Sequence, residues 1–455
     1  MVLLNSDNME IRKLTKQEEE EILKIPSSLI NQRKDYYQIL VVNYFITYKK
    51  ILANLFTRAG KSYLTLKAIT KYRKKFQDKI CIVAPSSSII EDWKKLLHEF
   101  DNIEYYVINS YTIGDVKIDK TYGMFIVDEI DVCLNEHSRW FSTAISSTKY
   151  DYFLGLSGTM GKEKIEFLEK HGIHHSFEIP LKTGYKLGVV PEFITYNVPV
   201  QLTDEEKVKF VKVSNDYNNQ MEFFSKFSEK STAYYISGLL QNKPVKYECE
   251  YSTNGWVNRE QLLQVMMDKM QTTKGNIFIR AKLWRQAMIE RVQLLHNSKA
   301  KLEAVENFCK SIDTNALIFT FKTDIADLLA EKIDGKAIHA KLTPKKRELL
   351  KTQFANKEFR FLTTCKSLDR GYTADVDYII STVFDSSVEK SNQRTGRGML
   401  LTKENQDKIL RIINFYIDDF EFNGKQYKSP DITWIERSQK NQSFINWIND
   451  VNEIK

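Results

Sequence analysis

A short segment, Thr57-Arg58-Ala59-Gly60-Lys61-Ser62, has the residue types of a phosphate-binding loop. In such a loop, backbone N–H groups at the start of a helix hold anionic phosphates, a lysine reaches the outer phosphates, and a serine hydroxyl binds Mg²⁺. Gly60 allows close approach of the backbone. The match to GxxxxGK[ST] is incomplete, because Leu55 stands where the first glycine belongs. The segment alone predicts nucleotide binding with Mg²⁺ but leaves open a chance Gly-Lys-Ser in a turn.

Two adjacent carboxylates supply a second half of a nucleotide site. Asp128 and Glu129 follow the apolar run 124–127, and Asp128 comes 67 residues after Lys61. The carboxyl ends of parallel strands line the ligand crevice of an open α/β sheet. There Asp128 can hold Mg²⁺ through water, and Glu129 can orient and deprotonate an attacking water. A solvated loop after a core strand is the alternative, and the upstream Lys61 and Ser62 favour the catalytic interpretation.

These residues need elements to hold them, and the chain alternates between strand and helix patterns. Short apolar runs are separated by longer amphipathic segments such as 62–76 and 88–100, which is typical of a parallel α/β sheet. In the first half the apolar runs lie at 51–56, 79–84, 104–108, 123–127 and 152–156. The alternation resumes with runs at 316–321, 336–339, 359–363 and 377–382 and a helical stretch at 343–355. The sequence therefore predicts two α/β domains.

A polar, helix-prone segment separates the two halves. It begins with a capping-box signal, Thr203 with Glu206, and is rich in lysine, asparagine, serine and aromatic residues. Its lysines and aromatics, such as Lys226, Tyr234 and Trp256, could meet phosphates and stack on bases, or the aromatics could form the core of the insert. We expect an N-terminal extension, a first α/β domain, a helical insert and a second domain with a tail over residues 1–30, 31–200, 201–275 and 276–455.

Composition sets the broad class of the protein. The chain has 455 residues, of which 42% are hydrophobic and 28% are charged, as in a globular protein of several domains. A net charge of +8 favours a polyanionic partner, although a basic solvated surface would give the same value. The five cysteines lie far apart without metal-site spacing, so we expect reduced core residues. No signal-peptide pattern and no run near the ~20 apolar residues of a membrane span are present, which predicts a cytoplasmic protein without a membrane partner.

The motifs and their order resemble those of superfamily 2 helicases. Gly60-Lys61-Ser62, Asp128-Glu129-Ile130-Asp131, Ser157-Gly158-Thr159 and Gln393-Arg394-Thr395-Gly396-Arg397 are similar to motifs I, II, III and VI of that family. The wider sequence around the phosphate loop most resembles phage-encoded UvsW-type branch-migration helicases. The resemblance covers roughly residues 34–400. It implies two RecA-like P-loop domains, ATP and Mg²⁺ as cofactors, and nucleic acid bound across both domains.

The resemblance also implies roles for further residues. Gln38 would read adenine, and Arg397, with Arg394 beside it, would stabilise the γ-phosphate from the second domain. Coupling of the nucleotide to the domain interface would involve Ser157, Gly158, Thr159, Gly371 and Gln393. Contacts with the nucleic-acid backbone would come from Pro85, Ser86, Ser110, Thr320, Lys322, Thr363 and Thr364.

Three positions depart from the family pattern. Leu400 stands where the family usually has a third arginine, so one γ-phosphate contact is missing or supplied by another group. Arg58 replaces a small residue of the phosphate loop, and Thr373 stands where motif V often carries aspartate. These changes concern the details of coupling.

The leading hypothesis is an ATP-dependent helicase or translocase that unwinds or branch-migrates forked or junction DNA in replication, recombination or repair. An RNA helicase is the first alternative, because phosphate contacts alone do not distinguish the two sugars. A second alternative is an ATP-gated nucleic-acid clamp with weak turnover, suggested by Leu400 and the irregular phosphate loop. A nuclease is disfavoured, because no further carboxylate cluster with a lysine lies outside these motifs.

Overall fold

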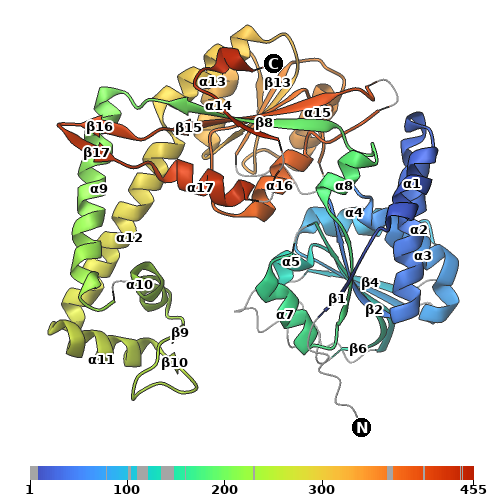
Figure 1. The fold of residues 1–455 in the computed structure, drawn as a ribbon, viewed down its shortest axis with the longest axis horizontal. Coiled ribbons are helices and arrows are strands. Elements are labelled where there is room, and N and C mark those ends of the chain that lie inside the picture. The colour runs from blue at the N-terminus through green and yellow to red at the C-terminus, as the bar shows by residue number, and fades with distance from the viewer. Residues whose placement is uncertain are drawn as a thin grey trace.

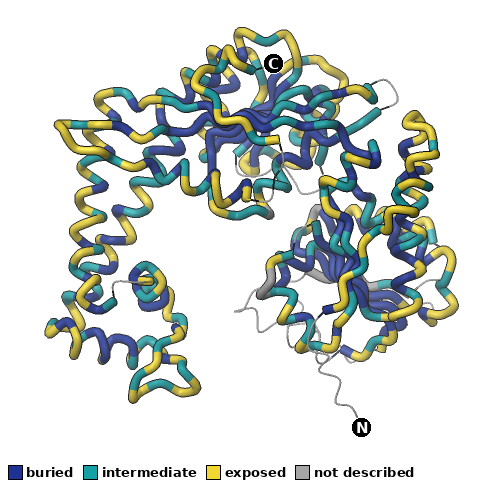
Figure 2. The backbone as a smooth tube through the Cα atoms, in the orientation of Figure 1, coloured by how far each residue is buried: buried dark blue, intermediate teal, exposed yellow. Residues whose placement is uncertain are grey.

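The computed structural model has three parts, which are two α/β domains and a helical arm (Figure 1). The first domain and the arm extend from the same side of the second domain (Figure 1). Buried residues concentrate in the two sheets (Figure 2). Among the described residues, no helix has both the length and the apolar character required to cross a bilayer. The structure describes residues 9–77, 79–100, 104–109, 121–134, 148–158, 160–228, 231–365, 372–402, 405–440, 442 and 444–454.

Seven parallel strands form the sheet of the first domain, in the order β1-β7-β2-β6-β5-β3-β4. The strands are β1 (Glu10–Lys13), β2 (Lys50–Leu55), β3 (Lys79–Ala84), β4 (Glu104–Asn109), β5 (Thr121–Val127), β6 (Lys149–Ser157) and β7 (His175–Ile179). Each of the five strand runs predicted for this half corresponds to one of β2 to β6. Because β6 lies between β2 and β5, the segments that follow these three strands meet at one edge of the sheet.

Helices surround this sheet, and some of them begin at a side-chain cap. They are α1 (Lys16–Lys24), α2 (Ile30–Tyr48), α3 (Lys61–Tyr72), α4 (Ser87–Leu97), α5 (Ile130–Cys133) and α7 (Lys162–Lys170), with 3₁₀ turns η1 (Ser27–Leu29) and η2 (Arg73–Phe76). Helix α3 starts directly from the phosphate loop, and α4 is capped by the Ser86 hydroxyl, which accepts from the N–H of Ile89. Trp93 on α4 is buried against the domain core.

The amino-terminal segment is part of the first domain, contrary to the expectation of an extension over residues 1–30. Strand β1 pairs with β7, with Glu10 opposite His175, and forms the edge of the sheet. Both strands are short and carry charged residues, so they lack the continuous apolar run that marks a central strand. Edge strands of this kind give a weak sequence signal.

The second domain also contains a parallel seven-stranded sheet, in the order β12-β13-β11-β14-β15-β8-β18. Its strands are β8 (Glu192–Val200), β11 (Ala316–Thr320), β12 (Lys336–Ile338), β13 (Phe361–Cys365), β14 (Tyr378–Ser381), β15 (Ile409–Ile417) and β18 (Ile445–Trp447). Its helices are α13 (Lys299–Ser311), α14 (Thr323–Lys332), α15 (Pro344–Ala355), α16 (Val388–Gly396) and α17 (Pro430–Gln439). A hairpin of β16 (Phe420–Phe422) and β17 (Lys425–Tyr427) and the turn η3 (Val451–Glu453) complete it. Two RecA-like α/β domains are thereby present, as the sequence predicts.

The chain crosses between the domains earlier than residue 200, where the sequence analysis puts the boundary. Strand β8 pairs with β15 along its whole length, from Glu192 opposite Ile409 to Val200 opposite Ile417. The crossing therefore lies between β7 and β8 and includes the short helix α8 (Leu181–Lys186). No strand is predicted from the sequence at these residues, and the residues of β8 alone do not indicate which sheet they join, which explains the error.

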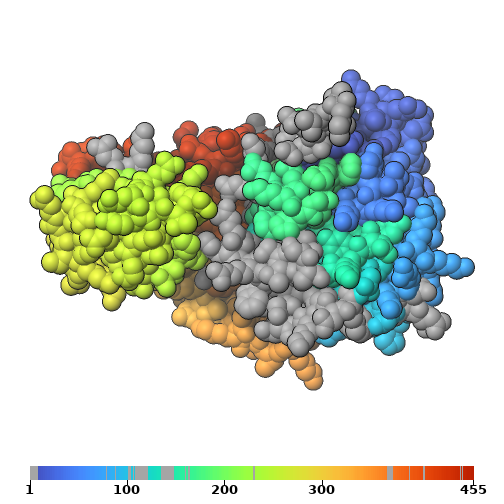
Figure 3. All heavy atoms as spheres, turned by 90° about the horizontal axis from the view of Figure 1, so that it is seen from below, coloured from blue at the N-terminus to red at the C-terminus, as the bar shows by residue number. Residues whose placement is uncertain are grey.

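The arm is mainly helical and longer than the predicted insert over 201–275. It consists of α9 (Asp204–Ser225), α10 (Thr232–Gln241), β9 (Val245–Lys246), β10 (Trp256–Val257), α11 (Arg259–Met270) and α12 (Lys274–His296). The predicted capping box of Thr203 and Glu206 starts α9. Seen from below, the arm is a separate lobe beside the first domain (Figure 3). Because α12 continues to His296, the insert ends about twenty residues later than expected.

The arm has a hydrophobic core of its own, which is one of the two alternatives that the sequence left open for its aromatic residues. Phe227 is buried in this core, and Tyr235 packs against it. Tyr234 and Trp256 are instead 45% and 43% exposed. The aromatic residues of the arm thus divide into an internal and an external set.

A buried ion pair joins the elements at the base of the arm. The Lys301 ammonium on α13 contacts the Asp431 carboxylate on α17, and both side chains are 0% exposed. Lys301 Nζ also donates to Thr382 O at 3.2 Å, and Asp431 Oδ2 accepts from Ile417 N at 2.9 Å. The pair therefore ties two helices to the ends of β14 and β15. Removing one partner would leave an uncompensated buried charge.

We predict that Lys301→Met destabilises the second domain by about 3–5 kcal/mol, because Asp431 loses its cation. Urea unfolding measures the loss, with Lys310→Met as the matched control. Lys310 forms a surface pair with Glu306, so its removal should cost about 1 kcal/mol or less. Lys301→Met combined with Asp431→Leu should recover part of the loss. Equal losses in the two single variants would contradict this account.

Candidate active site

The loop between β2 and α3 has the backbone shape of an anion site. Gly60 caps the amino terminus of α3 with φ of 81°, and Arg58 also has a positive φ, 79°. Left-handed backbone at a non-glycine residue is uncommon and concentrates at functional sites. The N–H groups in the first turn of α3, which starts at Lys61 and Ser62, have no partner within the helix and can bind phosphate. Lys61 Nζ donates a long hydrogen bond, 3.5 Å, to Leu55 O.

Two side chains of α2 hold this loop from behind. Tyr37 Oη donates to Ala59 O at 3.0 Å, and Gln38 Nε2 donates to the same oxygen at 2.9 Å. Gln38 Oε1 accepts from Lys67 Nζ at 2.8 Å. A Cβ at Gly60 would lie 2.4 Å from Gln38 Nε2. The resemblance predicts that Gln38 reads adenine. In the structure Gln38 is 3% exposed and its amide is bonded to the loop and to Lys67, so it positions the phosphate loop.

The two carboxylates follow β5 at the same edge of the sheet. Asp128 is buried, and its carboxylate accepts from Trp93 Nε1 at 2.9 Å and from Glu129 N at 3.0 Å. Burial raises the pKa of Asp128 to about 6, and the charge of Glu129 adds to this rise. The Trp93 hydrogen bond and Lys61 act in the opposite direction. Glu129 has a positive φ of 48°, a second strained backbone position at the site.

A hydrogen bond connects the carboxylate segment to the end of β6. Ser157 Oγ donates to Asp131 Oδ1 at 3.0 Å, and both residues are buried. Gly158 follows, and a Cβ there would lie 3.7 Å from Lys61 Nζ. The predicted coupling residues Ser157 and Gly158 thus lie against the nucleotide motifs. Thr159 and Gly371 lie outside the described residues.

The second domain contacts the phosphate loop through a glycine. A Cβ at Gly396 would lie 2.3 Å from Thr57 Cγ2 and 2.8 Å from Thr57 Cβ. A side chain at position 396 would therefore collide with the side chain of Thr57. Gly396 ends α16, and Arg397 directly after it donates from Nη1 to Tyr372 O at 2.9 Å. The close approach brings Arg397 to the phosphate loop.

One cavity of about 510 Å³ contains groups from both domains. Its lining includes the predicted residues Thr57, Arg58, Gly60, Lys61, Ser62, Asp128, Glu129, Gly158, Gln393 and Arg397. The two predicted magnesium ligands, Ser62 and Asp128, therefore border the same space. The described residues contain no cluster of three or more histidine, cysteine, aspartate or glutamate residues that could hold a metal ion.

Cations crowd this cavity. Burial lowers the pKa of the Arg58 guanidinium to about 10, and the nearby charge of Arg397 lowers it further. Burial and the charge of Arg58 lower the pKa of Lys34 on α2 to about 8. The Nε of Arg58 is buried without a hydrogen-bond partner. Like charges held together in a partly dry cleft favour a bound polyanion.

Arg394 does not share this cavity, which contradicts its predicted contact with the γ-phosphate. Its Nη1 donates to Val383 O at 2.8 Å, and its Nη2 bonds Asp385 Oδ2 at 3.3 Å. These bonds fix α16 to the end of β14, so of the two arginines of this motif Arg397 is the one that lines the cleft. One turn of a helix separates the two side chains, and the sequence alone could not tell which of them faces the nucleotide.

The residues predicted to contact nucleic acid divide by exposure. Lys322 is exposed, and Ser86 is partly exposed at the start of α4. Pro85, Thr320, Thr363 and Thr364 are buried. Thr320 Oγ1 donates to Thr364 O, and Thr363 Oγ1 donates to Ala326 O, so these two hydroxyls are used within the domain. Direct contact through the buried side chains is not supported. Ser110 lies outside the described residues.

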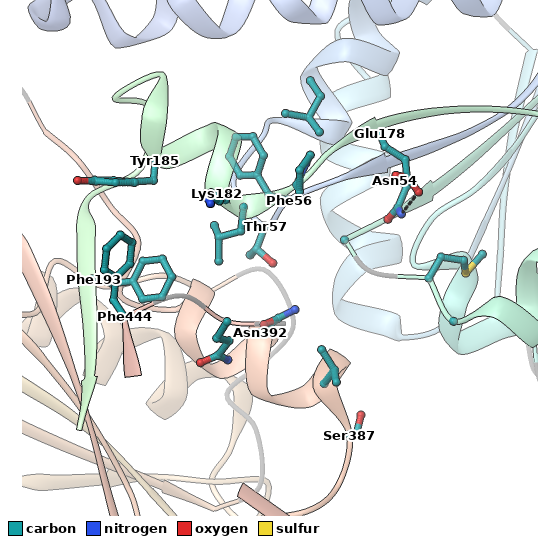
Figure 4. Close-up of a pocket in the computed structure, with 18 residues that line it drawn as sticks. Asn54, Phe56, Thr57, Glu178, Lys182, Tyr185, Phe193, Ser387, Asn392 and Phe444 are labelled. Atoms are coloured by element: carbon teal, nitrogen blue, oxygen red, sulfur yellow. Dashed lines mark hydrogen bonds between the residues drawn. The ribbon is translucent and has the colours of Figure 1, made fainter. Parts of the chain in front are cut away.

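A second, larger cavity of about 600 Å³ lies beside the nucleotide cleft, between the two domains (Figure 4). Its walls include the rings of Phe56, Tyr185, Phe193 and Phe444, and Asn54 Nδ2 donates to Glu178 Oε1 at 3.2 Å. Thr57, Gly158 and Asn392 border both cavities. Because Asp128, Glu129 and Arg397 line the smaller cavity and not the larger one, we assign the nucleotide to the smaller cavity.

Sequence reasoning missed several residues of the site. Trp93 and Asn392 line the nucleotide cavity, and Trp93 also holds Asp128. Trp93 lies on the apolar face of an amphipathic helix, where a tryptophan normally signals only core packing. Nothing in the local sequence indicates that its N–H reaches a carboxylate.

Comparisons with known proteins agree with this arrangement. Residues 300–399 match the family described as helicase conserved C-terminal domain. The chain is 24% identical over 183 residues to the probable helicase D10 of Escherichia phage T5, a match that covers 36% of this chain and 38% of the phage protein. The chain thus matches well under half of that relative.

A solved structure has a similar fold. S. cerevisiae Dbp5 bound to RNA and ADP BeF3 aligns with 88% of this chain and 85% of its own, with a TM-score of 0.50 and 11% sequence identity. At that identity the likeness concerns the fold alone. The comparisons therefore show a helicase-type C-terminal domain at residues 300–399 within a two-domain α/β fold.

We predict that Gly396→Ala lowers ATP hydrolysis by roughly 10²-fold while nucleotide binding persists, because a Cβ would push Arg397 away from the cleft. Steady-state hydrolysis and equilibrium binding of a fluorescent ATP analogue separate the two effects. Gly275→Ala is the matched control, because a Cβ there meets nothing within 4 Å. Adding Thr57→Ser removes the methyl group that would clash and should restore part of the activity. Full activity of Gly396→Ala would contradict close packing of the domains.

We predict that binding of Mg²⁺ with ATP weakens about tenfold per pH unit below pH 6, because protons compete with the metal ion for Asp128. The carboxyl pKa is raised, so the carboxylate required for the metal is present above about pH 6 and lost below it. Titration of Mg²⁺ at fixed ATP between pH 5 and 8 measures the effect. Asp128→Asn should bind weakly at every pH, and a pH dependence unchanged in this variant would assign the effect to another group.

Proposed function

We propose that the chain is an ATP-driven DNA helicase or translocase that unwinds or branch-migrates forked or junction DNA. The observation that carries the proposal is the single cavity lined by Lys61 and Glu129 of the first domain and Arg397 of the second. A hydrolytic site split between two domains makes turnover depend on their relative position. This dependence is what converts hydrolysis into motion.

The residues of the cleft can perform each part of phosphoryl transfer. Lys61 and the N–H groups at the start of α3 bind the phosphates. Ser62 and Asp128 would hold Mg²⁺, which supplies charge neutralisation at the phosphate oxygens when bound. Glu129 orients the attacking water and accepts its proton. Arg397 stabilises the charge that develops on the γ-phosphate.

Repulsion between the cations explains how the cleft would open and close. Arg58 and Arg397 face the same cavity, and the charge of Arg397 disfavours the charged form of Arg58. A nucleoside triphosphate brings the negative charge that offsets this repulsion, and loss of the γ-phosphate removes part of it. The domains then close on ATP and separate after hydrolysis. Alternate tightening of their grip on a backbone would move the protein along one strand.

The sequence around the phosphate loop resembles that of phage branch-migration helicases. This resemblance supports DNA as the substrate and a role in replication, recombination or repair. RNA is the second candidate, since the fold neighbour Dbp5 was solved with RNA. The two substrates differ at the 2′-hydroxyl, which a competition assay can read directly.

We predict that forked or single-stranded DNA stimulates ATP hydrolysis and that Glu129→Gln abolishes it while ATP still binds, because only the water-activating carboxylate is lost. Steady-state hydrolysis is measured without nucleic acid and with single-stranded DNA, forked DNA or RNA. Arg360→Ala, which removes an exposed arginine outside the cleft, should behave as the wild type. Stimulation by RNA alone would favour the RNA helicase. Absence of stimulated turnover would favour an ATP-gated clamp.

A further inference from the structure

The far end of the arm has a small, well-defined hairpin. Thr253 and Trp256 exchange two backbone hydrogen bonds of 2.9 and 3.0 Å around Asn254 and Gly255. Both turn residues have positive φ, 53° and 77°, which is the geometry of a tight type I′ turn. Tyr247 N donates to Gly255 O at 2.9 Å and closes the hairpin further. The position of Trp256 is therefore set by the backbone.

The two faces of this hairpin differ in character. Val245 lies opposite Val257, and both are buried in the core of the arm. Lys246 lies opposite Trp256, and these two side chains share the other face, because residues paired across an antiparallel ladder project to the same side. Lys246 N donates to Tyr234 Oη at 2.9 Å, which brings the exposed ring of Tyr234 to the same place. We call Tyr234, Lys246 and Trp256 the tip patch.

The support beneath the tip patch is tightly packed. Phe227 and Tyr247 stack with ring centroids 5.2 Å apart, and Lys269 lies over both rings. A Cβ at Gly238 on α10 would lie 2.2 Å from Val245 Cγ1, so α10 packs directly on β9. A fixed surface loses little conformational freedom when it binds a ligand. Exposed aromatic rings on such a support are arranged for contact with another molecule.

The composition of the tip patch favours single-stranded nucleic acid. An aromatic ring stacks on the face of an unpaired base, and a neighbouring lysine attracts the phosphate of the same strand. A paired duplex hides its base faces within the stack. A protein partner would be expected to cover a larger apolar surface, with charge kept out of its centre. Here a lysine is paired across the ladder with Trp256, and its backbone N–H bonds the hydroxyl of Tyr234.

The arm holds the tip patch on the side that faces the first domain. The β9–β10 hairpin lies at the end of the arm away from the second domain, on the side toward the first domain (Figure 1). The view from below keeps the arm lobe beside the first domain (Figure 3). A strand leaving the two motor domains on that side would meet the hairpin.

We propose that the tip patch binds single-stranded nucleic acid by stacking Tyr234 and Trp256 on bases while Lys246 contacts phosphate. The inference rests on the proposed function and names a contact for the separated strand outside the motor domains. Binding there keeps two strands apart, because a base stacked on protein is withheld from its complement.

Trp256→Ala should weaken binding of a fluorescein-labelled single-stranded DNA by about 5- to 150-fold, the range that loss of one stacking residue gives. Fluorescence anisotropy of the full-length protein measures it. Trp447→Ala is the matched control, because Trp447 on β18 is 46% exposed and lies in the second domain. Trp256→Phe retains a ring and should recover most of the affinity. At saturating single strand the Trp256→Ala protein should hydrolyse ATP at the wild-type rate yet separate forked DNA more slowly.

The salt dependence tests the lysine separately. Lys246→Gln should reduce the slope of log affinity against log salt by about 0.7, the value for one phosphate contact on a single strand. Trp256→Ala should leave that slope unchanged, since stacking releases no counterion. If either residue had only a structural role, the two substitutions would not differ in their effect on the salt dependence.

The outcomes separate this inference from the proposed function. A wild-type protein that neither binds nor responds to nucleic acid would refute both. A wild-type protein that is stimulated by DNA, with Trp256→Ala binding the strand as tightly as the wild type, would overturn the tip patch alone. Equal losses in Trp256→Ala and Trp447→Ala would also overturn it. Unchanged strand binding together with loss of a protein partner would assign the patch to that partner.

Discussion

Cations from two domains meet at one cavity, and the arrangement of both domains depends on what offsets their charge. Lys61 and Arg58 come from the phosphate loop and Arg397 comes from the end of α16. Burial removes water that would screen them, so Arg58 and Arg397 repel each other more strongly than on an open surface. Asp128 and Glu129 balance part of this charge, and polyphosphate can balance the rest. The order of the strands, the helix behind the loop and the crossing between the domains all serve to hold these groups together.

Two glycines allow the close approaches between elements on which this cavity depends. Gly60 permits the left-handed turn into α3 and leaves room for the Gln38 amide behind the loop. Gly396 permits the second domain to reach Thr57. In both cases a single methyl group would displace a functional nitrogen, and displacements of about 1 Å are large on the scale of catalysis. Electrostatic attraction to a nucleotide can act across the domains only because these two positions carry no side chain.

The sequence predicted those elements whose local residue pattern directly reflects their position in the fold. Strands β2, β3 and β5 are buried on both faces, so their continuous apolar runs and the loops after them could be predicted. Strands β1, β7 and β18 are short, and β8 belongs to a sheet that its own residues do not identify. The same limit applies to side chains. The family resemblance predicts that Arg394 and Gln38 contact the nucleotide. In the structure they bond Asp385 and Ala59 instead, and these contacts depend on packing between elements, which no local sequence pattern indicates.

The base of the arm and the arginine helix share one short loop, which connects the two functional regions of the molecule. His296 ends α12, and its Nε2 accepts from Phe384 N at 3.4 Å. Burial, with the charges of Lys301 and Arg394, lowers the pKa of His296 to about 3, so the neutral ring can accept this bond at neutral pH. The next residue, Asp385, bonds Arg394 on α16, three residues before Arg397. A displacement of α12 therefore alters the loop that orients α16. Coupling between two binding sites is reciprocal in free energy. If this loop differs between the nucleotide-bound and nucleotide-free states, a nucleotide in the cleft changes the affinity of the arm for a strand. A strand on the arm then changes the affinity of the cleft for the nucleotide by the same factor.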